Sequence, residues 1–589
     1  MKIKFTYIGL FLWIIALSGC SHTSAPIHIK HMSSPDRSEA FDLSEQITPQ
    51  DAVYQMRLTE VEKYLKSGQL STAENLLANI PISELKSAAL QAQHRYLQAQ
   101  TFKQRHQWRN ALTLVMRINL KNLNPNQQAA ILQLQAELYS AMNRPIAKVY
   151  ALTKLSQLEN KTELYREIWY TLQPLDAPLL KAAISKSNDT YFKAWLELSY
   201  IGKRYADSPT TLKKYVKAWQ NKYPNHPHHN ALPDDIERTI NVRIYNPKKI
   251  AVLLPLSGKA AKHGKAVRDG IIANVIQKRR KKIEVQFYNT DNNAEKAYQK
   301  AINDGSDFII GPLLKESIEQ LSSNYNKMVP QLVLNHPDYM ISDPDRYYFS
   351  LSPSAESKQT ADYFNQLGLK NPLIIASSHS SNQKIAQGFN EQWLALTGNE
   401  AYTKFYNNNK EIKTVVQDAL SVIKSKKRIQ KVRDTYGSKI KADFRSRKDI
   451  DAMYLITFQN EIKLLKPFID VNTSVFSNPT PLYTNSRSHV ISRKGIYPSE
   501  LNGLMINDMP WLLKTTTEQQ LIEAWPHKFK RLYAMGYDSI GLIEKLAQMK
   551  ASQSYQVNAR TGLLSVDHTG VIKRQQNWAT FYRGKIRMK

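Results

Sequence analysis

The chain has 589 residues, of which 42% are hydrophobic, so it has enough apolar material for several buried cores and is not disordered throughout. Its 81 lysines and arginines outnumber its 50 aspartates and glutamates and give a formal net charge of +31. The only cysteine, Cys20, excludes an internal disulfide framework, a thiolate zinc site and a cysteine-ligated iron–sulfur cluster. The positive charge alone is compatible with nucleic acid, anionic lipid, a basic proteome or an acidic protein partner.

The N-terminus predicts an export signal that ends in a lipid-modified cysteine. Two lysines, Lys2 and Lys4, precede the uncharged stretch 5–16, which is shorter than the roughly 20 residues of a spanning helix. The stretch ends in Leu17-Ser18-Gly19-Cys20, which resembles the lipobox of bacterial lipoproteins. That resemblance implies a signal peptide over residues 1–19, cleavage after Gly19, and N-acyl and S-diacylglycerol groups on Cys20.

The residues that follow predict the compartment. Ser21, rather than an aspartate, follows the cysteine, which resembles the sorting default for the outer membrane. We therefore expect a protein anchored in outer-membrane lipid and facing the periplasm, with no access to nucleic acid. Residues 20–50 are rich in Ser, Pro, His and Thr without an apolar period and predict a flexible tether of at most about 100 Å.

Residues 51–225 have a helical apolar period and predict a tetratricopeptide-like solenoid. Short polar breaks recur at Gly68, His106 and Asn143, which are 38 and 37 residues apart, and each break is followed by a second helix. The alternative that we considered is an irregular all-helical domain. A helix is expected over 84–100 behind a Ser83 cap, and another after Asn124-Pro125.

Residues 226–246 predict an interdomain linker. The segment contains His226, His228 and His229, but two of these histidines flank prolines and no carboxylate or thiolate nearby completes a tetrahedral metal site. We therefore expect no metal here.

Beyond residue 247 the pattern changes to alternating strands and helices. The apolar run 250–255 is typical of a parallel strand that is buried on both faces, and later runs repeat it. We predict a two-lobed α/β domain over 247–589, with lobe 1 over 247–352 and 500–589 and lobe 2 over 353–499. The predicted fold class is thus a helical solenoid followed by a two-lobed α/β domain.

The α/β domain has candidate ligand residues but no recognisable catalytic set. Ser257 and Gly258 follow the first strand and Asn335 follows a later one, so we name these three as candidates for a cleft between the lobes. The loop 257–265 has the wrong spacing for a phosphate-binding loop, and two Ser-x-x-Lys matches lack the other elements of a serine enzyme. We expect no enzymatic activity, no cofactor and no metal.

A strongly basic segment lies in lobe 2. Residues 424–449 contain eleven basic and three acidic residues, and a second basic cluster occupies 278–282. Such a cluster is commonly ordinary solvated helix surface, but it can also bind an acidic protein or an anionic polymer. We name six residues as a candidate basic docking face: Lys424, Lys426, Lys427, Arg428, Lys431 and Arg433.

The second half of the chain resembles the LppC lipoprotein family. The matching strings occur in family order: Ile250-Ala-Val-Leu-Leu-Pro-Leu-Ser-Gly258, Ile310-Gly-Pro-Leu-Leu314, Leu334-Asn335-His-Pro-Asp338, Arg445-Ser-Arg-Lys-Asp-Ile-Asp-Ala452, Leu501-Asn-Gly503, Asp508-Met-Pro-Trp-Leu-Leu513, Arg531-Leu-Tyr-Ala-Met-Gly536 with Asp538, and Gly562-Leu-Leu-Ser-Val-Asp567 with Arg574 and Trp578. The segment 424–448 is more basic than we expect for this family.

The resemblance implies a tetratricopeptide-like N-terminal domain and a type I periplasmic-binding-protein fold behind it. It also implies that the protein crosses the peptidoglycan layer, binds a bifunctional class A penicillin-binding protein of the inner membrane and activates peptidoglycan synthesis. Two alternatives stay open. The α/β cleft could hold a small molecule or wall fragment as a sensor, or the chain could bind peptidoglycan directly as a tether.

Overall fold

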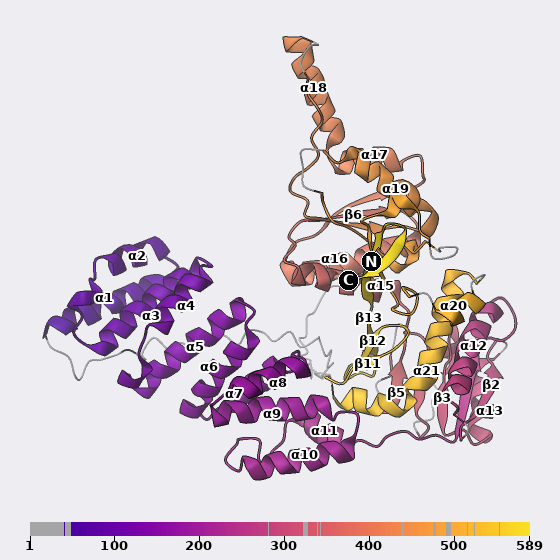
Figure 1. Cartoon of the computed structure of the whole chain (residues 1–589), viewed down its shortest axis with the longest axis horizontal. Helices are drawn as coiled ribbons and strands as arrows, with labels where there is room; N and C mark the ends of the chain where they lie inside the picture. Colours follow the sequence, from indigo (N-terminus) through magenta and orange to yellow (C-terminus); the bar gives the residue numbers. More distant parts are fainter. Residues whose placement is uncertain are drawn as a thin grey trace, which may run out of the picture. The chain divides into compact units, whose positions relative to one another are not determined.

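A computed structural model describes residues 41, 49–280, 282–291, 293–321, 328–337, 340–341, 343–437, 441–474, 479–490, 496–514, 516–522, 525–552 and 554–589. The predicted signal peptide, Cys20 and nearly all of the predicted tether lie outside these residues. The chain, drawn in Figure 1, divides into two compact units, residues 1–172 and 173–589. Within the described residues, none of the helices is both long and apolar enough to cross a membrane.

The first unit consists of three helix pairs followed by a single helix. They are α1 (Pro49–Lys66), α2 (Leu70–Ala78), α3 (Ala88–Gln104), α4 (Trp108–Met116), α5 (Pro125–Ala141), α6 (Pro145–Leu158) and α7 (Thr162–Leu172). The turns inside the first three pairs contain Gly68, His106 and Asn143, each with a positive φ angle. The recurring breaks in the sequence are therefore one repeated left-handed turn, as a helical repeat requires.

Helix starts in this unit follow local capping. Asn124 accepts a hydrogen bond from the Gln127 backbone N–H and forms a capping box in front of Pro125, as predicted. The expected helix over 84–100 instead begins at Ala88, because the Ser87 side chain caps it, and Ile82–Glu84 forms a separate 3-10 turn.

The second unit begins with more helices: α8 (Ala177–Lys186), α9 (Thr190–Arg204), α10 (Pro209–Lys222) and α11 (Asp234–Asn241). The predicted linker 226–246 thus contains a helix, and α11 packs against α21 (His527–Ala551) of the α/β domain. His226 is buried, with its ring 4.6 Å from Trp195 and 4.8 Å from Trp219 between ring centroids. The segment is therefore part of a packed surface and not a plain linker.

The first sheet of the α/β domain is parallel, with strand order β2-β1-β3-β4-β5. Its strands are β1 (Lys249–Leu254), β2 (Glu284–Asn289), β3 (Phe308–Ile310), β4 (Gln331–Val333) and β5 (Arg346–Tyr348). Alternate residues of β1 enter two different cores, Val252 on one face and Leu253 on the other. The helices that flank this sheet are α12 (Ala261–Gln277), α13 (Ala294–Asn303), α14 (Lys315–Gln320) and α21. We call this part lobe 1.

The second sheet has the order β15-β14-β10-β9-β8-β6-β7. Its strands are β6 (Pro372–Ser377), β7 (Tyr402–Tyr406), β8 (Ala452–Ile456), β9 (Leu482–Thr484), β10 (Met505–Asp508), β14 (Asn577–Tyr582) and β15 (Lys585–Met588). Its helices are α15 (Pro353–Gln366), α16 (Ser380–Thr397), α17 (Ile412–Ala419), α18 (Val422–Tyr436) and α19 (Gln459–Asn472). We call this part lobe 2.

The strand predicted over 250–255 is confirmed as β1, but the predicted lobe boundary is wrong for the end of the chain. Strand β10 pairs in parallel with β9, and β14 pairs antiparallel with β10, so these strands extend the sheet of lobe 2 and not that of lobe 1. Between them lie α20 (Thr517–Leu521), α21 and a small antiparallel sheet of β11 (Val557–Asn558), β12 (Leu563–Val566) and β13 (Ile572–Gln575). The chain therefore passes from one lobe to the other repeatedly.

Candidate docking helix and interlobe network

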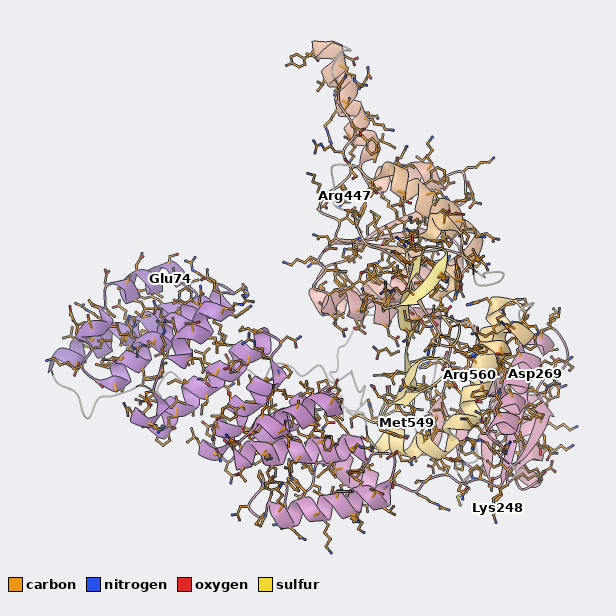
Figure 2. The ribbon with its side chains drawn as sticks, in the orientation of Figure 1. Glu74, Lys248, Asp269, Arg447, Met549 and Arg560 are labelled. Atoms are coloured by element: carbon orange, nitrogen blue, oxygen red, sulfur yellow. The ribbon has the colours of Figure 1, made fainter. Side chains whose placement is uncertain are left out.

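Helix α18 extends away from the rest of lobe 2 (Figure 1). Its first turn is packed against the lobe: Val422 and Ser425 are buried, and the Ser425 hydroxyl accepts a hydrogen bond of 2.9 Å from the Arg445 backbone N–H. A left-handed residue, Ser421, turns the chain between α17 and α18. The helix thus presents almost its whole length to solvent, and its side chains project on both sides of the ribbon (Figure 2).

All six residues of the predicted basic docking face lie on α18. Five of them are exposed and form no ion pair within the described part of the chain: Lys424, Lys426, Lys427, Arg428 and Lys431. Arg433 is less exposed and donates a hydrogen bond of 3.3 Å to the Ala442 carbonyl. Val432 and Tyr436 on the same helix are 43% and 76% exposed. The helix therefore combines positive charge with exposed apolar side chains near its free end.

A second group of charged residues, buried or nearly so, lies where the two lobes meet. Glu356, at the start of α15, accepts a hydrogen bond of 2.6 Å from Arg574 of β13 and is also paired with Arg531 of α21. The guanidinium of Arg531 donates a second bond, of 2.5 Å, to Asp508 at the end of β10. We call Glu356, Asp508, Arg531 and Arg574 the interlobe network; its two carboxylates and two guanidiniums balance in charge.

The network controls the protonation of its carboxylates. Burial alone would raise the pKa of Glu356, but Arg531 and Arg574 outweigh it and hold that pKa below its usual range. The pKa of Asp508 is lowered in the same way, with Arg531 and His489 opposing the effect of burial. Both carboxylates are therefore charged at neutral pH and bind α15 and β10 of lobe 2 to α21.

Two histidines extend the network. Asp508 Oδ2 lies 2.7 Å from His489 Nδ1 and 3.5 Å from His527 Nε2. Burial lowers the pKa of His527 to about 3, although Asp508 opposes the shift. Two histidines and a carboxylate within 4.8 Å of one another have the composition of a metal site. Arg531 already occupies the other oxygen of Asp508, however, so the cluster fits a buried ion-pair network and not a cation site.

The candidate cleft residues lie at the carboxyl ends of the lobe 1 strands, as predicted. The Ser257 hydroxyl donates to Asp291 at 3.0 Å and accepts from Asn289 at 2.8 Å. Gly258 has a φ of +65°, and a Cβ there would lie 2.4 Å from the Asp291 carboxylate. Asn335 donates to the Leu313 carbonyl at 3.0 Å. Their polar groups bond to neighbours in lobe 1, and their part in ligand binding stays a prediction.

The interlobe network was not among the predicted site residues. Three of its members, Asp508, Arg531 and Arg574, lie in strings that carried the family resemblance, so those strings were the available signal. Glu356 had no such signal, because an acidic residue in the first turn of a helix is ordinary.

Comparisons with known proteins agree with this architecture. A family model described as "LppC putative lipoprotein" matches residues 43–584. Penicillin-binding protein activator LpoA of Photobacterium profundum is 29% identical over 541 residues, which cover 88% of this chain and 86% of the relative. The protein of the same name from Vibrio cholerae is 28% identical over 503 residues and covers 83% of each chain. Both relatives are named as activators and not as enzymes.

A solved structure shares the fold. The crystal structure of full-length LpoA from Haemophilus influenzae superposes with a TM-score of 0.63 at 20% identity, covering 91% of this chain and 95% of that one. The predicted fold class, a helical domain followed by a two-lobed α/β domain, is confirmed. The match of the family model over most of the chain identifies the protein's family. The chain belongs to the LppC lipoprotein family.

Proposed function

We propose that this chain is a lipid-anchored, non-catalytic activator of a bifunctional class A penicillin-binding protein and thereby regulates peptidoglycan synthesis. The names of its curated relatives, which match along most of both chains, support this function. Helix α18 is the observation that carries the proposed mode of action: a basic, exposed helix suits contact with another protein.

The anchor is the lipobox cysteine. Acylated Cys20 holds the chain in the outer membrane, and a tether ahead of the helical unit gives it reach toward a synthase in the inner membrane. Substituting Cys20→Ala removes the anchor without altering the folded units. We expect the substituted chain in the soluble periplasmic fraction, whereas its recovery in the outer-membrane fraction would contradict the assignment.

The proposed binding partner of α18 is an acidic surface of the synthase. Five exposed cations without ion-pair partners in the described residues attract such a surface, and the attraction weakens as salt screens it. Val432 and Tyr436 supply apolar area that the partner can bury. Charge then guides the encounter, and the apolar contacts prolong it.

Activation follows if the contact distinguishes two states of the synthase. A partner that binds the active and inactive conformations equally well shifts no equilibrium, however tightly it binds. The chain must therefore bind the active conformation more tightly, by about 1.4 kcal/mol for each tenfold rise in the active population relative to the inactive one.

The test is a synthesis assay with purified components. The chain lacking residues 1–20 should raise the rate of glycan polymerisation or of peptide crosslinking by the synthase of the same organism. Heat-denatured chain is the control for nonspecific effects. The proposal fails if the folded chain neither binds the synthase nor raises either rate.

A further inference from the structure

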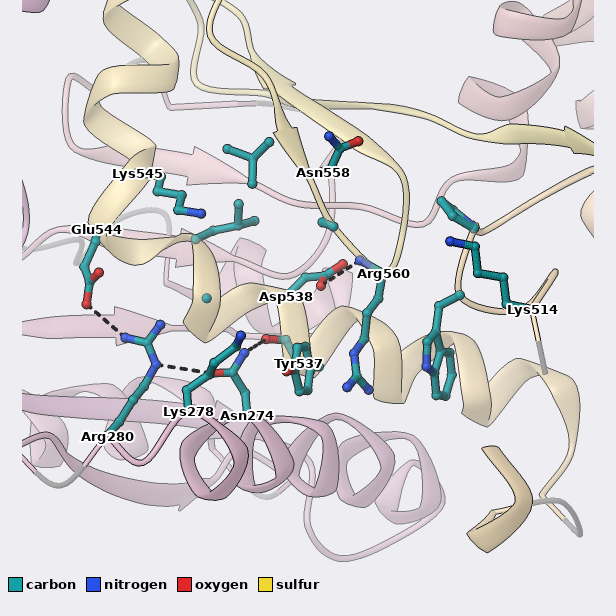
Figure 3. A pocket seen from close by; sticks show the side chains of 16 residues that line it. Asn274, Lys278, Arg280, Lys514, Tyr537, Asp538, Glu544, Lys545, Asn558 and Arg560 are labelled. Atoms are coloured by element: carbon teal, nitrogen blue, oxygen red, sulfur yellow. Dashed lines mark hydrogen bonds and ion pairs between the residues drawn. The ribbon is translucent and has the colours of Figure 1, made fainter. Parts of the chain in front are cut away.

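Lobe 1 contains a hollow of about 600 Å³ on the side of α21 that faces the small sheet (Figure 3). Its walls come from four places in the chain: the end of α12, the loop after β10, the middle of α21 and the strand β11. We call it the lobe 1 pocket. This volume lies within the range of sites that bind small molecules.

The wall between α12 and α21 is rigid. A Cβ at Gly270 would lie 2.0 Å from the Tyr533 carbonyl oxygen, and one at Gly536 would lie 2.1 Å from that of Val267, so only glycine lets the helices approach this closely. Asn274 then donates a hydrogen bond of 2.8 Å to the Tyr537 carbonyl across the contact. Close packing of α12 against α21 therefore fixes this wall of the pocket.

Five cations line the pocket against two carboxylates. The two arginines already have partners. Arg280 pairs with Glu544 at 2.9 Å, and Arg560 forms a bidentate pair with Glu518 at 2.7 and 2.6 Å. Arg560 also lies over the ring of Tyr537, 3.2 Å from its centroid. These arginines hold the walls together and are not available to a ligand.

Asp538, the other lining carboxylate, is also occupied. Its oxygens accept hydrogen bonds from the backbone N–H groups of Arg560 and Thr561, at 3.0 and 2.8 Å, and from the Thr561 hydroxyl at 2.7 Å. Burial raises the pKa of Asp538 to about 6 despite these bonds. These hydrogen bonds fix the loop after β11, and Asp538 forms no ion pair with a pocket lysine among the residues that the structure describes.

Three lysines remain: Lys278, Lys514 and Lys545. They come from the end of α12, the loop after β10 and α21, and they approach the hollow from different sides (Figure 3). None of the three forms an ion pair within the described residues. Solvated lysines are ordinary on a protein surface, but here they surround a concave wall with apolar members such as Trp511 and Leu542, which strengthens their combined field.

We propose that the lobe 1 pocket binds a small polyanion, a compact molecule with two or more carboxylate or phosphate groups. Three ammonium groups from separate elements match several anionic groups better than a single one, because each lysine acts as a point charge with rotatable donors. The aromatic and aliphatic side chains of the wall contact the body of the ligand. The basic cluster 278–282, which docking by α18 leaves without a role, supplies Lys278 to this pocket.

The test uses the full chain, purified in detergent, and two probes in separate calorimetric titrations at low salt: inorganic pyrophosphate and citrate. At least one probe should bind at a single saturable site. Each single substitution, Lys278→Gln, Lys514→Gln or Lys545→Gln, should weaken binding about threefold to fivefold, and the triple variant at least about 30-fold. Binding of pyrophosphate alone assigns a phosphate ligand, and binding of citrate alone assigns a carboxylate ligand.

The matched control is Lys424→Gln/Lys427→Gln/Lys431→Gln, which removes the same charge from α18 and should leave probe affinity unchanged. Equal loss in both triple variants would overturn the proposal, as would the absence of saturable binding of either probe. A second measurement needs no substitution. Saturating probe should protect Lys278, Lys514 and Lys545 from acetylation more than the α18 lysines, and equal labelling with and without probe would also overturn it.

Discussion

The interlobe network and α18 place the same kinds of charged side chain in opposite environments. Within the network, Arg574 is buried and the side chain of Arg531 is only 12% exposed, and each is paired with a carboxylate. On α18, five cations are exposed and without ion-pair partners in the described residues. A buried charge must be paired to be tolerated, whereas an exposed charge is solvated by water and can remain unpaired until a partner protein binds. Substitutions in the two regions should therefore affect different properties, stability in the first and binding in the second.

The largest expected effect is on stability, from Glu356→Gln. The substitution leaves Arg531 and Arg574 buried without their shared carboxylate, and breaking such a pair costs about 3–5 kcal/mol. Chemical denaturation followed by fluorescence should show the loss. The control is Glu391→Gln, which makes the same change in an exposed pair with Lys358 and should cost less than about 1 kcal/mol. Similar losses of unfolding free energy in both variants would contradict the distinction between the interlobe network and an exposed ion pair.

The next effect is the dependence of stability on pH. The unfolded chain protonates His527 below about pH 6.5, whereas the folded chain keeps it neutral down to about pH 3. The unfolded state thus binds more protons in this window, so stability should fall as pH falls, by about 3 kcal/mol at pH 4 from this residue. Glu356 and Asp508, whose pKa values are lowered, act in the same direction.

His527→Phe should reduce the slope of unfolding free energy against pH between pH 6.5 and 4. His568→Gln, a substitution of an exposed histidine, is the control and should leave the slope unchanged. An unaltered slope in His527→Phe would mean that His527 does not stay neutral in the folded chain.

A binding effect without a stability effect is expected from α18. Replacing Lys427, Arg428 and Lys431 with Gln should weaken binding to the synthase by about 10- to 100-fold and reduce its salt dependence. Unfolding free energy should change by less than about 0.5 kcal/mol. Lys213, Lys214 and Lys217, exposed on α10, offer a matched control. If the α10 substitutions weakened synthase binding equally, the effect of the α18 substitutions would come from net charge and not from contact with α18.

The smallest effect is expected from the apolar end of α18. Tyr436 is 76% exposed, so Tyr436→Ser should leave stability unchanged but weaken synthase binding by about threefold to tenfold through faster dissociation. Tyr170→Ser, at a position 47% exposed on α7, is the control. Surface plasmon resonance separates the two rates, and an unchanged dissociation rate would exclude Tyr436 from the interface.

Local pattern was sufficient to predict much of the fold. The breaks at Gly68, His106 and Asn143 are visible in the sequence because each must be a short polar turn. Parallel strands such as β1 are visible because both of their faces are buried, which demands a continuous apolar run. The basic helix was predictable because charge density is a property of the sequence itself.

The remaining features depend on contacts between distant segments. Glu356 and Arg574 are 218 positions apart, and no local pattern shows that they pair. The assignment of β10 and β14 to lobe 2 depends on strand pairing, which composition does not reveal. His226 looked like a linker residue because prolines surround it, yet it packs between tryptophans of α9 and α10. The lobe 1 pocket likewise depends on four separate elements.

The most direct test of the central claim is site-specific photocrosslinking with the purified synthase under conditions in which its activity is stimulated. A photoreactive residue at position 428 on α18 and another at position 213 on α10 would be compared. We predict a crosslink from position 428 to an acidic surface of the synthase, and none above background from position 213. Undiminished stimulation with no crosslink from position 428 would contradict docking through α18.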